Sequence, residues 1–137
     1  MRLEPTTHLR RFDHIDLRVR SLTEAWPFYE ALLPALGFTH EATIEGSLQY
    51  EAGNVDGAPE FVALVESPEF TPNESRIAFR ADTPGEVDRL ATIIAQAGAR
   101  HVEGPAYKNP QYYTVVFEDP SGNRLEICHR TREEASD

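Results

Sequence analysis

The chain has 137 residues, of which 40% are hydrophobic and 26% charged, and these proportions are those of one folded domain rather than a fibrous or disordered chain. Its 23 acidic and 13 basic side chains give a formal net charge of −10, which argues against nucleic acid and anionic membranes as partners. A single cysteine, Cys128, excludes an internal disulfide and a multi-cysteine metal site, and is typical of a small buried side chain.

Neither a membrane span nor a secretory signal is predicted. No apolar run approaches the ~20 residues that a membrane-spanning helix needs. Residues 1–10 carry charges and a proline where a secretory signal would have an apolar stretch. We therefore expect a single domain over residues 1–137, located in the cytoplasm.

The first half of the chain begins with a strand and a helix. Ile15, Leu17 and Val19 alternate with polar residues, which predicts a half-buried strand. A capping-box pattern at 21–24 then begins an amphipathic helix that ends at Gly37.

Two prolines fall inside this helix, and extended segments follow it. Because of Pro27 and Pro34 we expect the helix to start near Thr23 and to have a broken or kinked last turn. Further strands are predicted around residues 48–50 and 61–65, before a proline-containing linker.

The second half repeats this order. A strand with alternating apolar residues precedes a second capping box, in which Pro84 takes the first helical position. The predicted segments are a strand at 75–81, a helix from 83 to Gly98, a loop at 104–110, a strand at 111–118, a turn at 119–123 and a last strand at 124–130.

The two halves match by counting. His14 corresponds to Arg76 and Ala63 to Glu126, so the offsets are 62 and 63 residues. Near-constant spacing indicates a duplicated unit, with module one at about 11–67 and module two at about 75–130.

Three segments together resemble the vicinal oxygen chelate superfamily of glyoxalases, bleomycin resistance proteins and extradiol dioxygenases. These segments are RFDHIDLRV, FYEALLPALGF and FEDPSGNRLEICHR, and the likeness covers about residues 10–130. The resemblance implies an α+β fold in which two tandem βαβββ modules form one cup-shaped cavity from their curled mixed sheets. It also implies a homodimer that completes or covers the cup.

In this superfamily a divalent metal is held in the cup by the first and last strands of each module. The matching positions here are His14, Ala63, Arg76 and Glu126, and strand alternation independently turns His14 and Glu126 away from the apolar side. His14 and Glu126 suit zinc, iron, nickel or manganese, but a guanidinium has no lone pair to donate. The implied metal site is therefore degenerate, and we expect Arg76 to pair with Glu126 instead.

Several other residues are candidates for the cup. His8, His40 or His101 could replace a missing ligand. Ligand-binding candidates are Tyr113, Gln49, Tyr50 and Asn109; of Gln49 and Tyr50 only one can point inward, and Asn109 belongs to a segment that resembles the cavity mouth of family members.

The resemblance implies a lyase, isomerase or dioxygenase that acts on a small oxygenated molecule. With metal, His14 and Glu126 would hold the cation; without it, Arg76 would attract an anion and stabilise negative charge while His14 or Glu126 moves a proton. One alternative is a non-catalytic drug-binding protein of the bleomycin-resistance kind, which the negative charge favours for a cationic ligand. Others are a sensor or partner-binding subunit that has lost its site, or a purely structural hydrogen-bond cluster.

Overall fold

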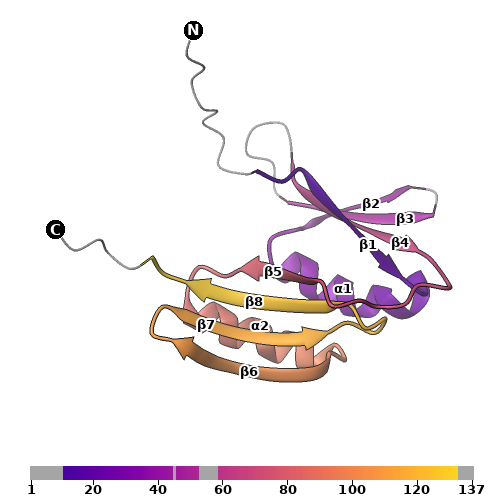
Figure 1. The fold of residues 1–137 in the computed structure, drawn as a ribbon. Coiled ribbons are helices and arrows are strands. Elements are labelled where there is room, and N and C mark those ends of the chain that lie inside the picture. Colours follow the sequence, from indigo (N-terminus) through magenta and orange to yellow (C-terminus); the bar gives the residue numbers. More distant parts are fainter. Residues whose placement is uncertain (1–10, 45, 53–58, 133–137) are drawn as a thin grey trace, which may run out of the picture.

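The computed structural model describes residues 11–44, 46–52 and 59–132, which form two βαβββ modules (Figure 1). Neither helix in these ranges is long and apolar enough to cross a membrane. In chain order the elements are β1 (His14–Val19), α1 (Leu22–Ala35), β2 (His40–Ile44), β3 (Ser47–Glu51), β4 (Phe61–Glu66), β5 (Arg76–Arg80), α2 (Pro84–Gln96), β6 (Arg100–Asn109), β7 (Tyr112–Glu118) and β8 (Arg124–Arg130).

Each module contributes one mixed four-stranded sheet. Sheet A has the order β1-β4-β3-β2, and sheet B has the equivalent order β5-β8-β7-β6. The parallel pairs also match: Asp16 lies opposite Ala63 in sheet A, and Ala78 lies opposite Glu126 in sheet B. The predicted α+β fold with two tandem modules is therefore confirmed, with Ala63 and Glu126 in equivalent places.

Each sheet packs one face against a helix. Helix α1 contacts β3 and β4, whereas α2 contacts β6, β7 and β8. Leu17, Val19, Leu125 and Ile127 are buried on these helix-facing sides, so the alternate residues His14, Asp16, Arg124 and Glu126 lie on the opposite side. We call these opposite sides the outer face of sheet A and the outer face of sheet B.

Helix α1 is continuous through both of its prolines. It begins at Leu22, one residue before the predicted start, because the hydroxyl of Ser21 accepts a hydrogen bond from the backbone N–H of Glu24 at 3.1 Å. It passes Pro27 and ends at Ala35, directly after Pro34. Its apolar stripe supplies much of the core of module one.

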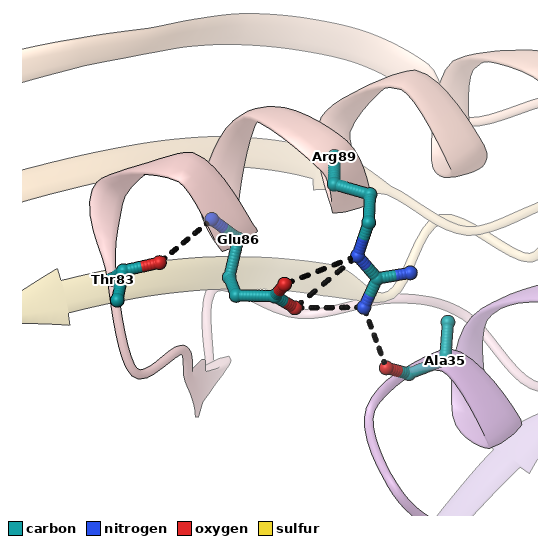
Figure 2. A network of polar contacts seen from close by, with 4 residues as sticks. All are labelled: Ala35, Thr83, Glu86 and Arg89. Atoms are coloured by element: carbon teal, nitrogen blue, oxygen red, sulfur yellow. Dashed lines mark hydrogen bonds and ion pairs between the residues drawn. The ribbon is translucent and has the colours of Figure 1, made fainter.

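Helix α2 begins at the second predicted capping box and is tied to α1 (Figure 2). The Thr83 hydroxyl accepts from the backbone N–H of Glu86, whose carboxylate pairs with Arg89 at 2.7 Å. Arg89 also donates to the carbonyl of Ala35 at 3.3 Å, at the C-terminal end of α1. Because the Glu86–Arg89 ion pair is exposed, it adds little to stability. The hydrogen bond from Arg89 to Ala35 links the two helices.

The modules are joined by an inter-module clamp of Arg20, Tyr29, Asp119, Ser121 and Asn123. The fully buried Tyr29 hydroxyl donates to Asp119 at 2.5 Å, and Arg20 donates to Ser121 and Pro120 in the β7–β8 turn. The Asn123 amide donates to the carbonyl of Arg18 at 2.8 Å. Burial, with the adjacent Asp119 charge, raises the pKa of Tyr29 well above its usual value, so the phenol stays a donor.

Strand β6 corrects one expectation from the sequence. Residues 104–110 were predicted as a loop because they contain glycine and prolines, but β6 continues through residue 109. Register shifts between Arg100 and Glu103, and again between Glu103 and Ala106, let the irregular strand stay paired with β7.

Candidate active site

Glu126 is the buried carboxylate on the outer face of sheet B. Its side chain is turned outward by β8, whose Leu125 and Ile127 enter the core. The residue is only 5% exposed. One carboxylate oxygen, Oε2, accepts hydrogen bonds from Thr114 at 2.6 Å and from the Tyr112 hydroxyl, both on the neighbouring strand β7. The other oxygen, Oε1, has no hydrogen bond to another described residue.

Strand β7 holds this carboxylate with two hydroxyl groups. Burial, and then the hydrogen bond to Glu126, raises the pKa of Tyr112, which keeps the phenol protonated and donating. The guanidinium of Arg130 lies 3.9 Å from the centre of the Tyr112 ring and restrains it. Glu126 is therefore held by neutral donors, with one oxygen left for another partner.

Tyr112 and Thr114 were not singled out from the sequence. The available signal was the two-residue period of β7, which places both on the outer face, where Tyr112 lies opposite Arg130 and Thr114 opposite Cys128 on β8. Recognising it needed the register between the two strands.

Arg76 lies on the same face but does not pair with Glu126. Its partner across the parallel strands is Arg124, whereas Glu126 is opposite Ala78. Among the described residues, no ion pair joins Arg76 to Glu126. The expected pairing is corrected for a clear reason: hydroxyl donors from β7 already satisfy Oε2, so the carboxylate needs no counter-charge.

His14 lies on the outer face of sheet A. Its Nδ1 is 2.7 Å from Asp13, and its ring stacks on Phe61 with centroids 4.5 Å apart. The hydrogen bond to Asp13 raises the pKa of His14, against a smaller opposing effect of desolvation, and Asp16 adds to the rise. An imidazole held in this way can carry a proton. No hydrogen bond or ion pair between described residues joins His14 to Arg76 or Glu126.

The remaining candidates separate by face. Gln49 lies on the outer face of sheet A, opposite Ala63, while Tyr50 is buried on the helix-facing side. Tyr113 also faces the helices and donates to Asp88 of α2 at 2.5 Å. Asn109 accepts from the backbone N–H of Gln111 and shapes the β6–β7 turn. Tyr50 and Tyr113 thus lie on helix-facing sides, and neither lies on the face that carries Glu126.

Cys128 follows Glu126 on the same face of β8. Burial raises the pKa of its thiol, and the Glu126 charge adds to that rise. The side chain therefore stays a thiol near neutral pH, which does not favour a role as nucleophile.

The donor set within one chain does not fit the divalent metal that the resemblance implies. Among the described residues, no group of three or more His, Cys, Asp or Glu lies close enough to hold an ion. Arg76, at the position of a second histidine ligand, brings a fixed positive charge and no lone pair. Of the possible replacements, His40 and His101 join no such group, and His8 lies outside the described residues.

This chain is similar to two solved structures and to one further protein. A glyoxalase/bleomycin resistance protein from Albidiferax ferrireducens T118 superposes with a TM-score of 0.73 at 23% identity, covering 88% of this chain and 98% of that one. The fosfomycin resistance protein FosX from Mesorhizobium loti gives 0.65 at 18% identity, covering 90% and 95%. The Arabidopsis thaliana protein named Glyoxylase I 4 is 24% identical over 128 residues, covering 89% of this chain and 72% of that protein.

A family model supplies the assignment. The model of the glyoxalase/bleomycin resistance protein/dioxygenase superfamily matches residues 11–127, which is nearly all of both modules. The paired βαβββ modules and the matching sheet orders agree with it. This chain therefore belongs to the glyoxalase/bleomycin resistance protein/dioxygenase superfamily.

Proposed function

We propose that the protein is an enzyme that abstracts a proton from a small oxygenated molecule bound at the outer face of sheet B. The observation that supports this most is the open oxygen of Glu126. A carboxylate that is 5% exposed, with Oε2 held by two hydroxyls and Oε1 unpartnered among described residues, has the position of a general base. Because both hydroxyl groups bond to the same oxygen, Oε1 remains available to a substrate.

In the proposed reaction a C–H proton next to a carbonyl moves to Oε1 of Glu126. The electron pair of that bond moves to the carbonyl oxygen, giving an enolate, and Arg76 stabilises the new negative charge. His14 returns a proton to the product. No step is assigned to a metal, because the donors described above do not fit one.

We propose that a second copy of the chain brings His14 to this face. His14 and Glu126 lie on different sheets without contact in one chain. Phe12, just before β1, is 79% exposed, and Ile44, the last residue of β2, is 53% exposed. Large exposed apolar side chains favour a covered surface. In the proposed homodimer, the outer face of sheet A in one copy closes the cup over sheet B of the other.

Hydrogen–deuterium exchange tests the proposed chemistry without knowledge of the final product. A panel of small keto and hydroxy acids is incubated in D2O with the protein, and loss of C–H signals is followed by proton NMR. We expect wild-type protein to exchange at least one compound about 100-fold faster than Glu126→Gln, the lower end of what a general base contributes. The control Glu69→Gln changes an exposed carboxylate and should leave the rate unchanged.

Equal rates for wild type and Glu126→Gln would contradict the role of Glu126. Saturable binding without exchange would instead support the alternative of a non-catalytic binding protein of the bleomycin-resistance kind.

Metal titration tests whether His14, Arg76 and Glu126 converge. Arg76→His replaces a cation by a metal donor, so we expect the affinity for Ni²⁺ or Zn²⁺ to rise at least about tenfold by calorimetry. Adding His14→Ala to that variant should remove the gain, and sedimentation should report a dimer. An affinity unaffected by Arg76→His would mean that the three side chains do not meet, in one chain or in a dimer.

A further inference from the structure

A small polar pocket lies at the end of the outer face of sheet B nearest the β7–β8 turn. Its volume is about 220 Å³, below the range of ~300–1,000 Å³ typical of drug-sized ligands, so it suits a small group. Its lining residues are Arg76, His101, Glu103, Val116, Phe117, Glu118 and Arg124. All four strands of the sheet contribute, and Val116 lies directly opposite Glu126, so the pocket adjoins the proposed base.

Two guanidinium groups face this pocket, and neither is neutralised by a direct ion pair with another described residue. Arg76 and Arg124 are directly opposite each other on parallel strands and both are exposed. Neither side chain forms a hydrogen bond or ion pair with another described residue. Like charges at directly opposed positions destabilise a sheet. An anion placed between the two forks would relieve this repulsion.

His101 supplies a third donor and is held in an unusual backbone conformation. Its φ of 52° is the only positive value at a non-glycine residue in the described part of the chain. Such conformations persist where the surroundings fix them, often at ligand sites. Its Nδ1 lies 3.1 Å from the carboxylate of Glu118, which leaves Nε2 for the pocket. In the protonated ring, Nε2 is a hydrogen-bond donor.

We propose that this pocket binds the oxyanion group of the substrate, a carboxylate, phosphate or sulfate, between Arg76 and Arg124, with His101 as the third donor. This deepens the proposed function, on which its catalytic meaning rests, because it names the charged group by which a substrate is held beside Glu126. Arg124 is two residues from Glu126 on β8, a distance of about 7 Å along the strand. A small acid bound there would place its neighbouring carbons near Oε1.

Glu103 sets a limit on the affinity. Its carboxylate lines the same pocket and has no hydrogen bond or ion pair to another described residue. It therefore repels an anion directly. Removing this negative charge should strengthen anion binding, whereas removing an arginine should weaken it. The two substitutions therefore test the proposal in opposite directions.

Calorimetric titration with sulfate tests the proposal, because sulfate keeps one charge state across neutral pH. At low ionic strength we expect saturable binding that weakens about tenfold in Arg124→Gln, as for loss of a charged hydrogen bond. Glu103→Gln should bind several-fold more tightly. The matched control is Arg130→Gln, which removes an arginine from the same strand at its far end, over Tyr112, and should leave the affinity unchanged.

The sulfate titration also tests the role of His101. The charged groups that face this ring are Arg76 on β5, Glu103 on β6, Glu118 on β7 and Arg124 on β8. Because its Nε2 is the proposed third donor to the anion, His101→Ala should weaken sulfate binding several-fold.

No saturable sulfate binding to the wild type, or equal weakening in Arg124→Gln and Arg130→Gln, would overturn the oxyanion site. These outcomes are separable from failure of the proposed function, since sulfate binding needs neither Glu126 nor a second copy. Sulfate binding without deuterium exchange would leave the site standing and remove the chemistry. Deuterium exchange without sulfate binding would support the proposed chemistry and overturn the oxyanion site.

Discussion

Replacing Asp119 by alanine should lower the free energy of unfolding by at least about 3 kcal/mol. Asp119 is 0% exposed and accepts four hydrogen bonds: from the Tyr29 hydroxyl at 2.5 Å, the backbone N–H groups of Ser121 and Asn123, both at 2.8 Å, and the Asn123 amide at 2.9 Å. Removing the carboxylate leaves several buried donors without an acceptor, and each costs ~1–3 kcal/mol. Urea unfolding followed by far-UV circular dichroism measures the loss.

The chain contains a matched control for this substitution. Asp88 also accepts a tyrosine hydrogen bond at 2.5 Å, from Tyr113, but this pair is exposed. Asp88→Ala should therefore change stability by less than about 1 kcal/mol. Similar losses for the two variants would mean that the inter-module clamp is not what makes Asp119 important.

Replacing Gly104 by alanine should destabilise the protein by about 3 kcal/mol, because two costs combine there. The residue has a φ of +93°, which side-chain-bearing residues rarely adopt. A Cβ would also lie 2.7 Å from the carbonyl oxygen of Thr114 and 3.1 Å from the backbone nitrogen of Ala106. Backbone atoms of two paired strands cannot move away without loss of their ladder. Denaturant unfolding measures this loss.

Gly98 separates the two costs. Its φ is +96°, almost the same, but an added Cβ would meet nothing within 4 Å. Gly98→Ala should therefore cost only about 1 kcal/mol, the conformational part. If both glycines gave the same loss, the close approach of β6 to β7 would have no energetic consequence.

The duplicated architecture was predictable because it rests on local patterns. Alternation in β1 and β8 placed His14 and Glu126 on the outer faces, and two capping boxes marked where the helices begin. Ala63 and Glu126 occupy equivalent positions in the parallel strand pairs of the two sheets, which confirms that they correspond between the two halves. Strand β6 was missed because its Gly-Pro sequence is typical of a loop, whereas the structure pairs it with β7.

The candidate site was less predictable because its contacts run between strands. The expectation that Arg76 would neutralise Glu126 was wrong, since the hydroxyls of Tyr112 and Thr114 reach the carboxylate across the β7–β8 ladder. Nothing in the local sequence gives His101 its positive φ, which accompanies the irregular start of β6. Whether His14, Arg76 and Glu126 meet remains a prediction.

The hydrogen bond between Tyr29 and Asp119 also orders events during synthesis of the chain. Its acceptor lies 90 residues after its donor, so the first module is synthesised before the acceptor of this hydrogen bond. At ~5–20 residues per second, that interval lasts on the order of 5–20 s. The nascent first half must therefore await the last turn of the second before it reaches its final stability.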